Sequence, residues 1–312
     1  MTYTNQRIAY GETLVKMGKD NPKIVVMDAD LCASTMGKLY EIEYKERHYE
    51  MGIAEANMLS VAAGLSTTGR IPFANSFAVF VAGRAYDQIR QTIAIGKLNV
   101  KIVGSSAGLS DFGDGATHQS IEDMAIMGAI PNMTVICPAD ANETVAATKA
   151  IAKYHGPVYM RLNRNDYDNV TEEGKPFVIG EPDVLLDGKD VVVFATGYMV
   201  GLALKAAKLL ADEISVKVVN VATIKPLPKE KLIHLAKDAK VIVTAEEHSV
   251  IGGLGSVVLN AFAQTPIPIE MIGLEDVFGC SAHNYDELLE HFNLTDTAVA
   301  DRIKQAYFAH KE

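Results

Sequence analysis

The sequence predicts an α/β protein made of two doubly wound domains. Short apolar runs, typical of buried strands, alternate with stretches of helical period along the chain. This alternation is the pattern of mostly parallel sheets with helices on both faces. It is interrupted between Asp166 and Lys189, where charge, proline and glycine increase. With 312 residues, the chain is long enough to form two cores.

The first domain is expected over residues 1–168. Its strands are predicted at residues 23–28, 71–73, 100–103, 133–137 and 158–161 from their short apolar runs. Its helices are predicted at residues 8–17, 58–65 (beginning near Glu55), 78–95, 121–127 and 142–154 from their helical period. Asp140 is placed to cap the last of these helices.

Residues 169–188 are expected to form a linker, and residues 189–312 a second domain of the same type. Its strands are predicted at residues 191–195, 216–221, 240–244 and 267–272. Its helices are predicted at residues 199–210, 229–237, 252–263, 285–290 and 296–310.

Composition narrows the class of protein. The net charge of −10 argues against a broad nucleic-acid surface, and no apolar run is long enough to span a bilayer. The N-terminus lacks the apolar core of a signal peptide, so the cytoplasm is the expected compartment. The three cysteines, Cys32, Cys137 and Cys280, are too widely spaced for a disulfide framework or a metal site. We therefore expect no metal ligands in this chain.

Glu55 is a carboxylate at the start of an apolar run, MGIAEANMLSVAAGL from Met51. Burial of a carboxylate is costly unless its proton is shared or it has a partner, and active sites often use such a group. A glutamate that interacts with a helix dipole would produce the same pattern. Both interpretations fit the residues alone.

The loop that follows the strand at residues 100–103 is a second candidate site. It is rich in glycine and serine, and Asp114 and His118 near its end could bind sugar hydroxyls or move protons. Turn chemistry and helix capping would also account for these residues. A Gly-Asp-Gly run at 113–115 with a later Asn142 resembles a metal–diphosphate signature, but Asn142 reads better as a neighbour of a helix cap.

Four residues could meet an anionic group. They are Arg7, Ser34, Ser106 and Arg164, because guanidinium forks suit phosphate oxygens. They are far apart in the sequence, so each could equally be an ordinary surface or ion-paired residue. His248 has no metal-binding spacing and is expected to stabilise its own loop.

The order and spacing of several stretches resemble the C-terminal half of transketolase in its split, two-polypeptide form. The stretches are RIAYGETL from Arg7, DADLCAS from Asp28, MGIAEANMLSVAAGL from Met51, FANSFAVF from Phe73, GDGATHQSIEDMA from Gly113, PNMTVICPADANET from Pro131 and EEHSVIGGLGS from Glu246. The resemblance covers essentially the whole chain. It implies a thiamine-diphosphate pyrimidine-binding domain over residues 1–168 and a transketolase C-terminal domain over residues 189–312.

The resemblance also implies a cofactor and a partner. The cofactor is thiamine diphosphate, and the domain that holds its diphosphate through Mg²⁺ or Ca²⁺ would lie on an N-terminal partner subunit. Two copies of each chain, an α2β2 assembly with a self-dimer of this chain, are expected. No nucleic-acid or membrane partner is expected.

The resemblance also implies roles for individual residues of this chain. Glu55 matches the glutamate that hydrogen-bonds the cofactor's ring nitrogen, and His118 matches a histidine near the donor sugar. The expected cofactor contacts are Glu55, Phe77, Phe80 and Asp30, and the expected substrate contacts are Arg7, Ser34, Ser106, Asp114, His118 and Arg164. The implied reaction moves a two-carbon ketol unit from a ketose phosphate to an aldose phosphate.

Three departures from the family pattern leave the substrate open. Ser106 replaces a histidine that helps to hold phosphate, Gly83 replaces a tyrosine present in some members, and the loop SDFGDG from Ser110 replaces the usual run. These changes allow a specialised transketolase for an unusual, for example branched, sugar phosphate. The beta subunit of a 2-oxo acid dehydrogenase's first component and a non-catalytic protein are further alternatives.

Overall fold

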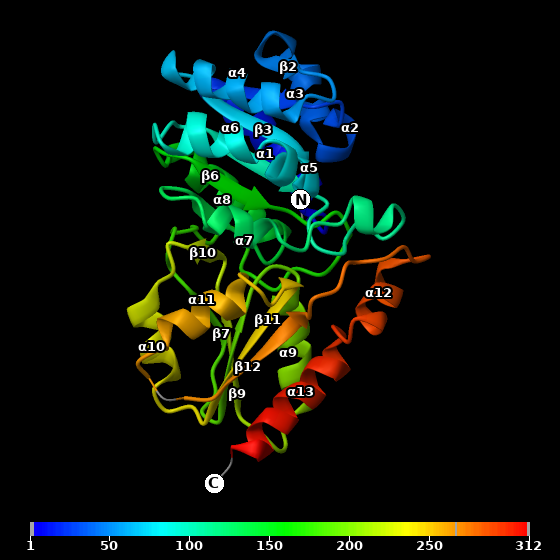
Figure 1. The fold of residues 1–312 in the computed structure, drawn as a ribbon, viewed down its shortest axis with the longest axis vertical. Helices are drawn as coiled ribbons and strands as arrows, with labels where there is room; N and C mark the ends of the chain where they lie inside the picture. The colour runs from blue at the N-terminus through cyan, green and yellow to red at the C-terminus, as the bar shows by residue number, and fades with distance from the viewer. Residues whose placement is uncertain (1–2, 266, 311–312) are drawn as a thin grey trace.

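The computed structural model describes residues 3–265 and 267–310. It has two α/β domains, one above the other in Figure 1, with the N-terminus beside the junction and the C-terminus at the far end of the second domain. The predicted fold class is confirmed: each domain has a mostly parallel sheet with helices on both faces.

The first sheet has seven strands in the order β10-β5-β6-β4-β3-β1-β2. Its strands are β1 Ile24–Asp28, β2 His48–Glu50, β3 Ile71–Phe77, β4 Lys101–Ser105, β5 Thr134–Ile136, β6 Val158–Arg161 and β10 Thr223–Lys225. All neighbours pair in parallel except β10, which is antiparallel to β5. The carboxyl ends of the six parallel strands therefore share one edge of the sheet.

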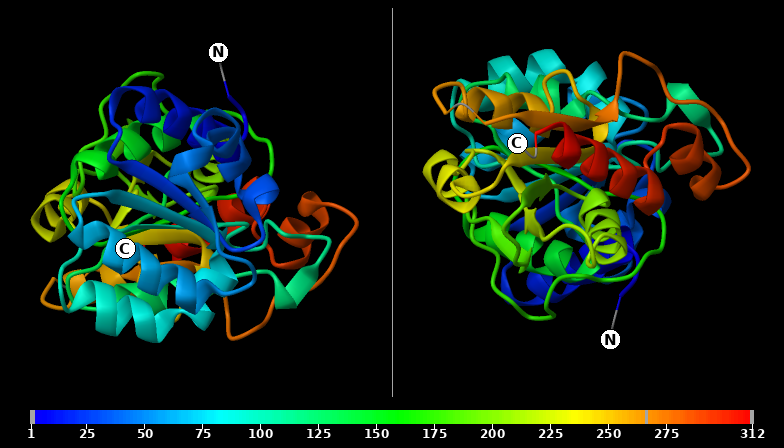
Figure 2. Two further views of the ribbon diagram at one scale, coloured as in Figure 1. Left: turned by 90° about the horizontal axis from the view of Figure 1, so that it is seen from above. Right: turned by 90° about the horizontal axis from the view of Figure 1, so that it is seen from below.

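Helices cover both faces of this sheet, as the view from above in Figure 2 shows. One face carries α1 Gln6–Asp20, α3 Gly37–Glu43 and α8 Ala141–Lys153, and the other carries α4 Glu55–Thr67, α5 Ala78–Arg84 and α7 Asp123–Gly128. The short elements are α2 Cys32–Thr35, the 3-10 turns Lys45–Arg47 and Gly115–Thr117, α6 Tyr86–Gln88 and the π-helical turn Ile89–Ala94.

The second sheet has five strands in the order β12-β11-β8-β9-β7. Its strands are β7 Asp183–Leu186, β8 Val191–Ala195, β9 Val216–Asn220, β11 Val241–Ser249 and β12 Ile269–Leu274. Only β7, at the edge, is antiparallel. The helices of this domain are α9 Met199–Leu209, α10 Lys229–Ala236, α11 Leu254–Ala261, α12 Tyr285–His291 and α13 Asp296–Ala309.

Several elements differ from the sequence predictions. The single helix predicted over residues 78–95 is broken at Ala85 into α5, α6 and a π-helical turn. The segment predicted as a linker ends in β7, which extends the second sheet. Strand β10 was not predicted, and it crosses back to pair with β5 of the first sheet.

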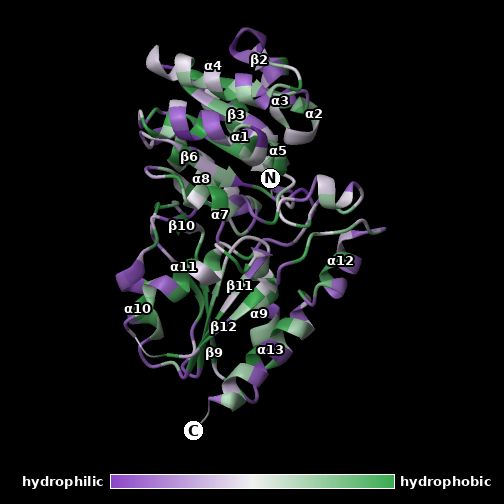
Figure 3. Ribbon diagram, in the orientation of Figure 1, coloured by the Kyte–Doolittle hydropathy of each residue, from purple (hydrophilic) through white to green (hydrophobic). Residues whose placement is uncertain are grey.

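The apolar core continues across the junction between the domains. One cluster of buried side chains joins Val135 of β5 and Ile224 of β10 to Val192 and Phe194 of β8. In Figure 3 the central strands are mostly in the hydrophobic colour, whereas α10 carries both hydrophilic and hydrophobic colour. Because the core is shared, the two domains support each other's packing.

Candidate active site

The parallel strands of the first sheet bring distant site residues to one edge. Asp30 follows β1, Phe77 ends β3, Ser106 follows β4 and Arg164 follows β6. Arg7 lies in the first turn of α1, which precedes β1 and so begins near the same edge. Ligands of doubly wound proteins bind at such an edge.

Glu55 begins α4, as the sequence predicted, and is only 3% exposed. Its Oε1 accepts a hydrogen bond from Nη1 of Arg84, the last residue of α5, at 3.1 Å. The Arg84 guanidinium also lies 4.0 Å from the centroid of the Phe80 ring. One arginine therefore connects the buried carboxylate to the aromatic side chains of the site.

Phe77 and Phe80 stack with their ring centroids 6.0 Å apart and an interplanar angle of 16°. His118 meets both rings edge-on, at 5.2 Å from Phe80 and 6.3 Å from Phe77. The His118 Nδ1 lies 3.0 Å from the hydroxyl of Thr117. The His118 imidazole therefore lies beside the Phe77–Phe80 pair. This position suits a side chain that exchanges protons with a ligand bound against these rings.

The arginines predicted to bind an anion lie together. Arg7 donates from Nη1 to the Ser34 carbonyl at 2.8 Å and from Nη2 to the Arg164 carbonyl at 3.0 Å. The Arg164 guanidinium lies 5.8 Å from the centroid of the Phe77 ring. Arg164 therefore lies next to Phe77, one of the two rings that His118 contacts.

Burial and charge both act on Arg7. Desolvation, followed by the charge of Arg164, lowers the pKa of Arg7 to about 10, while Asp111 and Asp166 oppose the shift. Two cations held close together in a partly buried position favour the binding of an anion.

Asp111 was missed by the sequence analysis. Its Oδ2 accepts a hydrogen bond from Arg164 Nη1 at 2.5 Å. The only signal in the sequence was the altered loop SDFGDG in which Asp111 lies. Nothing in a single sequence indicates that this loop contacts Arg164, which follows β6.

Three predicted site residues do not join this set of contacts within the described residues: Asp30, Ser106 and Asp114. Asp30 and Asp114 are exposed, and the Asp30 amide donates to Glu50 Oε1 at 2.6 Å. Ser106 is fully buried in a left-handed conformation with φ 54°, and its hydroxyl has no hydrogen-bond partner. Its side chain therefore has no direct access to a ligand in this conformation.

The second domain contacts the loop at residues 109–119, which carries Asp111, Asp114 and His118. Glu247 of β11 accepts a hydrogen bond from the Leu109 amide at 2.6 Å, and burial raises the pKa of Glu247 to about 7. The Ala282 amide donates to the Phe112 carbonyl at 2.9 Å. In Figure 1 the segment before α12 runs alongside this loop. The C-terminal domain thus fixes the backbone from which Asp111 and His118 project.

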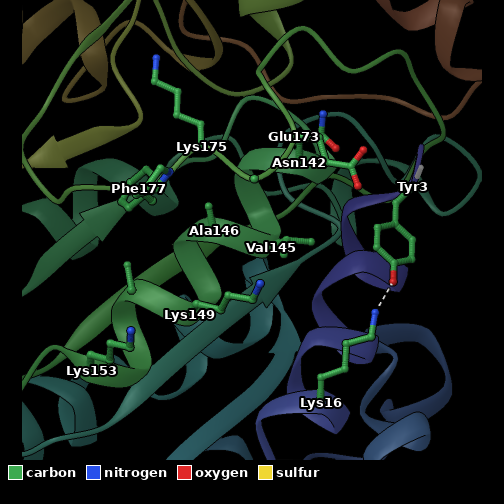
Figure 4. A pocket seen from close by; sticks show the side chains of 13 residues that line it. Tyr3, Lys16, Asn142, Val145, Ala146, Lys149, Lys153, Glu173, Lys175 and Phe177 are labelled. Carbon is green, nitrogen blue, oxygen red and sulfur yellow. Dashed lines mark hydrogen bonds between the residues drawn. The ribbon is translucent and has the colours of Figure 1, made fainter. Parts of the chain in front are cut away.

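A basic groove of about 500 Å³ lies elsewhere, between α1, α8 and the segment after residue 172. Figure 4 shows four lysines around an apolar floor: Lys16, Lys149, Lys153 and Lys175. Lys16 donates to the Tyr3 hydroxyl, and Lys175 pairs with Asp183. Asn142 lines this groove and donates to the Thr171 carbonyl, so its role is to join α8 to the segment that follows β6.

Among residues 3–265 and 267–310, no cluster of three or more His, Cys, Asp and Glu side chains could hold a metal ion, and no helix is long and apolar enough to cross a bilayer.

Two family models match the chain in succession. The transketolase pyrimidine-binding domain matches residues 3–169, and the transketolase C-terminal domain matches residues 180–299. A Methanocaldococcus jannaschii protein named as a transketolase C-terminal section is 46% identical over 310 residues, covering 97% of this chain and 96% of that protein. The 6-deoxy-6-sulfo-D-fructose transketolase subunit of Clostridium sp. is 40% identical, covering 93% and 90%.

A solved structure described as a split-gene transketolase, an inactive beta4 tetramer, has a TM-score of 0.90 and 45% identity, covering 99% of this chain and 100% of that one. The chain belongs to the transketolase family. Its pyrimidine-binding domain is followed directly by the C-terminal domain of that family.

Proposed function

We propose that this chain is the C-terminal subunit of a thiamine-diphosphate-dependent transketolase. With an N-terminal subunit that carries the diphosphate and metal domain, it transfers a two-carbon ketol unit from a ketose phosphate to an aldose phosphate. The observation that carries the proposal is the position of Glu55, buried at the start of α4 and connected through Arg84 to the stacked Phe77 and Phe80 rings.

These residues fit the pyrimidine end of the cofactor. When bound, thiamine diphosphate supplies the nucleophilic carbon of the reaction. Glu55 would hold a proton at the ring nitrogen, and its burial would keep water from competing for that proton. Phe77 and Phe80 would wall the ring with apolar surface. Asp30, exposed in the segment that follows β1, would lie near the cofactor and the partner subunit.

The remaining residues would act on the substrate. His118, held at the edge of the aromatic pair, would accept or return a proton at a hydroxyl of the donor sugar. Asp114 would accept a hydrogen bond from the hydroxyl next to the donor carbonyl. Arg7 and Arg164 would bind the terminal anion, with Ser34 beside them.

A specialised substrate is the second candidate. The buried position of Ser106 removes a contact to phosphate that a histidine would make in other members, and the loop around Asp111 is altered. One relative is named for a sulfosugar rather than for a pentose phosphate. The paired arginines weigh against a 2-oxo acid dehydrogenase, whose substrates lack a phosphate group.

The assembly is expected to require both subunits. A solved relative of this chain is described as inactive when it forms a beta4 tetramer. We infer that this chain likewise has no activity alone and that two copies combine with two partner subunits.

The test is reconstitution of the purified pair with thiamine diphosphate and Mg²⁺, followed by assays on a panel of ketose and aldose phosphates. Ketol transfer by the pair, and by neither subunit alone, supports the proposal. Strong activity with xylulose 5-phosphate would remove the specialised alternative. Decarboxylation of pyruvate or a branched 2-oxo acid without ketol transfer would overturn the assignment.

A further inference from the structure

The anion site formed by Arg7 and Arg164 already contains a carboxylate. Asp111 Oδ2 lies 2.5 Å from Arg164 Nη1, on the guanidinium that also approaches the Phe77 ring. A hydrogen bond between ionised partners is among the stronger ones in proteins. One of the donors that a substrate anion would use is therefore engaged within the protein.

The local charge is close to balanced. Arg7 and Arg164 contribute two positive charges, and Asp111 and Asp166 both act on Arg7 as negative charges. The Asp166 carboxylate is held by the Asn5 amide at 2.8 Å. An arriving anion meets the attraction of two cations and the repulsion of two carboxylates. A second negative charge on the ligand increases both, so it adds less net attraction than it would without the carboxylates.

Asp111 cannot easily turn away from the site. Its side chain is 3% exposed, whereas that of Arg164 is 29% exposed. Its carbonyl accepts hydrogen bonds from the Gly115 amide at 3.2 Å and from Gln119 Nε2 at 3.2 Å. A carboxylate that loses its partner while buried is strongly destabilised. Asp111 therefore keeps its bond to Arg164, and a ligand must share that guanidinium through its exposed side.

We propose that Asp111 is a specificity-determining residue: its fixed carboxylate reduces the preference of the Arg7–Arg164 site for a dianionic terminal group over a monoanionic or uncharged one. The inference rests on the proposed function for its link to catalysis, because it defines the class of sugar that the site accepts. Binding of small anions to the chain tests it independently of that function.

The experiment compares two probes of nearly equal shape on the full-length chain. Methylphosphonate is a dianion at alkaline pH, and methanesulfonate is a monoanion. Their dissociation constants are measured by calorimetry for the wild type, Asp111→Asn and Asp111→Glu. Asp166→Asn is the matched control, because it removes a nearby charge that does not contact Arg164.

We expect the wild type to bind the two probes within roughly threefold of each other, and Asp111→Asn to favour methylphosphonate by roughly tenfold more, since one opposing charge is lost. Asp111→Glu, which keeps the charge, should retain the wild-type ratio, and Asp166→Asn should change it less than Asp111→Asn. The proposal is overturned if Asp111→Asn binds both probes more weakly at an unchanged ratio, because Asp111 would then position Arg164 for the anion.

The reconstituted enzyme gives the catalytic readout. Asp111→Asn should lower KM for ribose 5-phosphate relative to that for unphosphorylated ribose. If the probe ratio shifts as expected but no ketol transfer is found on any sugar, the proposed function fails while the role of Asp111 in anion selection stands. If ketol transfer occurs and neither the probe ratio nor the KM ratio shifts, the role of Asp111 is refuted.

Discussion

Arg84 donates a hydrogen bond to Glu55 at 3.1 Å while its guanidinium lies over the Phe80 ring, 4.0 Å from the centroid. The bond gives the buried carboxylate a charged partner, and the ring contact fixes where that partner lies. Half of the Arg84 side chain is exposed, so Arg84 can move away when another group approaches Glu55. Arg84 is therefore suited to stabilise the Glu55 carboxylate without permanently blocking access of a ligand to it.

Glu55→Gln should inactivate the reconstituted enzyme. Glutamine keeps the size of the side chain but cannot exchange a proton with a ring nitrogen, and general acid–base steps contribute about 10²–10⁴-fold. We expect a loss of kcat in that range, measured by ketol transfer with saturating cofactor. Glu46→Gln, at an exposed position on the same chain segment, should retain full activity. Retention of activity in Glu55→Gln would refute the assigned role.

Arg84→Met should distinguish the effect of the ion pair between Arg84 and Glu55 from that of the packing of Arg84 on Phe80. Methionine can cover Phe80 but leaves Glu55 without its partner, so the free subunit should lose thermal stability. Because a competing contact to Glu55 is also lost, cofactor affinity in the assembled enzyme should rise by roughly threefold to tenfold, as measured by titration of activity. Arg90→Met, exposed in the π-helical turn Ile89–Ala94, is the control. Weaker cofactor binding in Arg84→Met would show instead that Arg84 holds the cofactor.

The sequence was sufficient for features that depend on local pattern. Residues 158–161 form a strand as predicted, Glu55 begins a helix, and Asp140 accepts a hydrogen bond from the Glu143 amide as an N-cap. Each of these follows from a run of a few residues whose periodicity or capping chemistry is visible in the chain itself.

The sequence was not sufficient for features made by contacts between distant segments. The bond between Leu109 and Glu247 joins residues 138 positions apart, and that between Asp111 and Arg164 joins residues 53 apart. The break at Ala85 also escaped prediction, because the flanking residues favour a helix. Packing against other elements determines such features, and no local pattern encodes it.

Asp140→Ala should be strongly destabilising, because Asp140 does more than cap α8. Its carboxylate accepts a hydrogen bond from the Glu143 amide at 2.9 Å. It also accepts hydrogen bonds from the Val170 and Thr171 amides, each at 2.7 Å. Loss of a cap costs about 0.5–2 kcal/mol, and the amides left unpaired raise the expected total to about 3 kcal/mol. Urea unfolding measures the change.

The matched control for Asp140 is Asn284→Ala. At an exposed site, the Asn284 side chain caps α12 by accepting a hydrogen bond from the Glu287 amide at 3.0 Å, and it also donates to Glu287 Oε1 at 3.3 Å. Its loss should cost about 1 kcal/mol. Equal costs for the two substitutions would show that the bonds from Asp140 to residues 170 and 171 contribute nothing to stability.

His248 should make stability fall at acid pH, because it is buried in its neutral form at the junction of the domains. Its Nε2 accepts the Met124 amide at 3.2 Å, and burial lowers its pKa from 6.5 to about 4. The groups that face it are Glu246, Asp123 and Arg161. Between these two pH values the unfolded chain binds a proton that the folded chain does not, so the free energy of unfolding decreases as pH falls from 6.5 towards 4.

The measurement is urea unfolding of the wild type and His248→Gln over this pH range, since glutamine can still accept the Met124 amide but cannot titrate. The difference between the two proteins should change by at most about 1.4 kcal/mol per pH unit. Glu246 and Glu247, whose pKa values burial raises to about 8 and about 7, gain protons in the folded state as pH falls and act in the opposite direction. Because both proteins retain these carboxyls, the comparison cancels their effect. Parallel pH profiles would mean that His248 takes up its proton over the same pH range in the folded and the unfolded chain, so that burial does not lower its pKa.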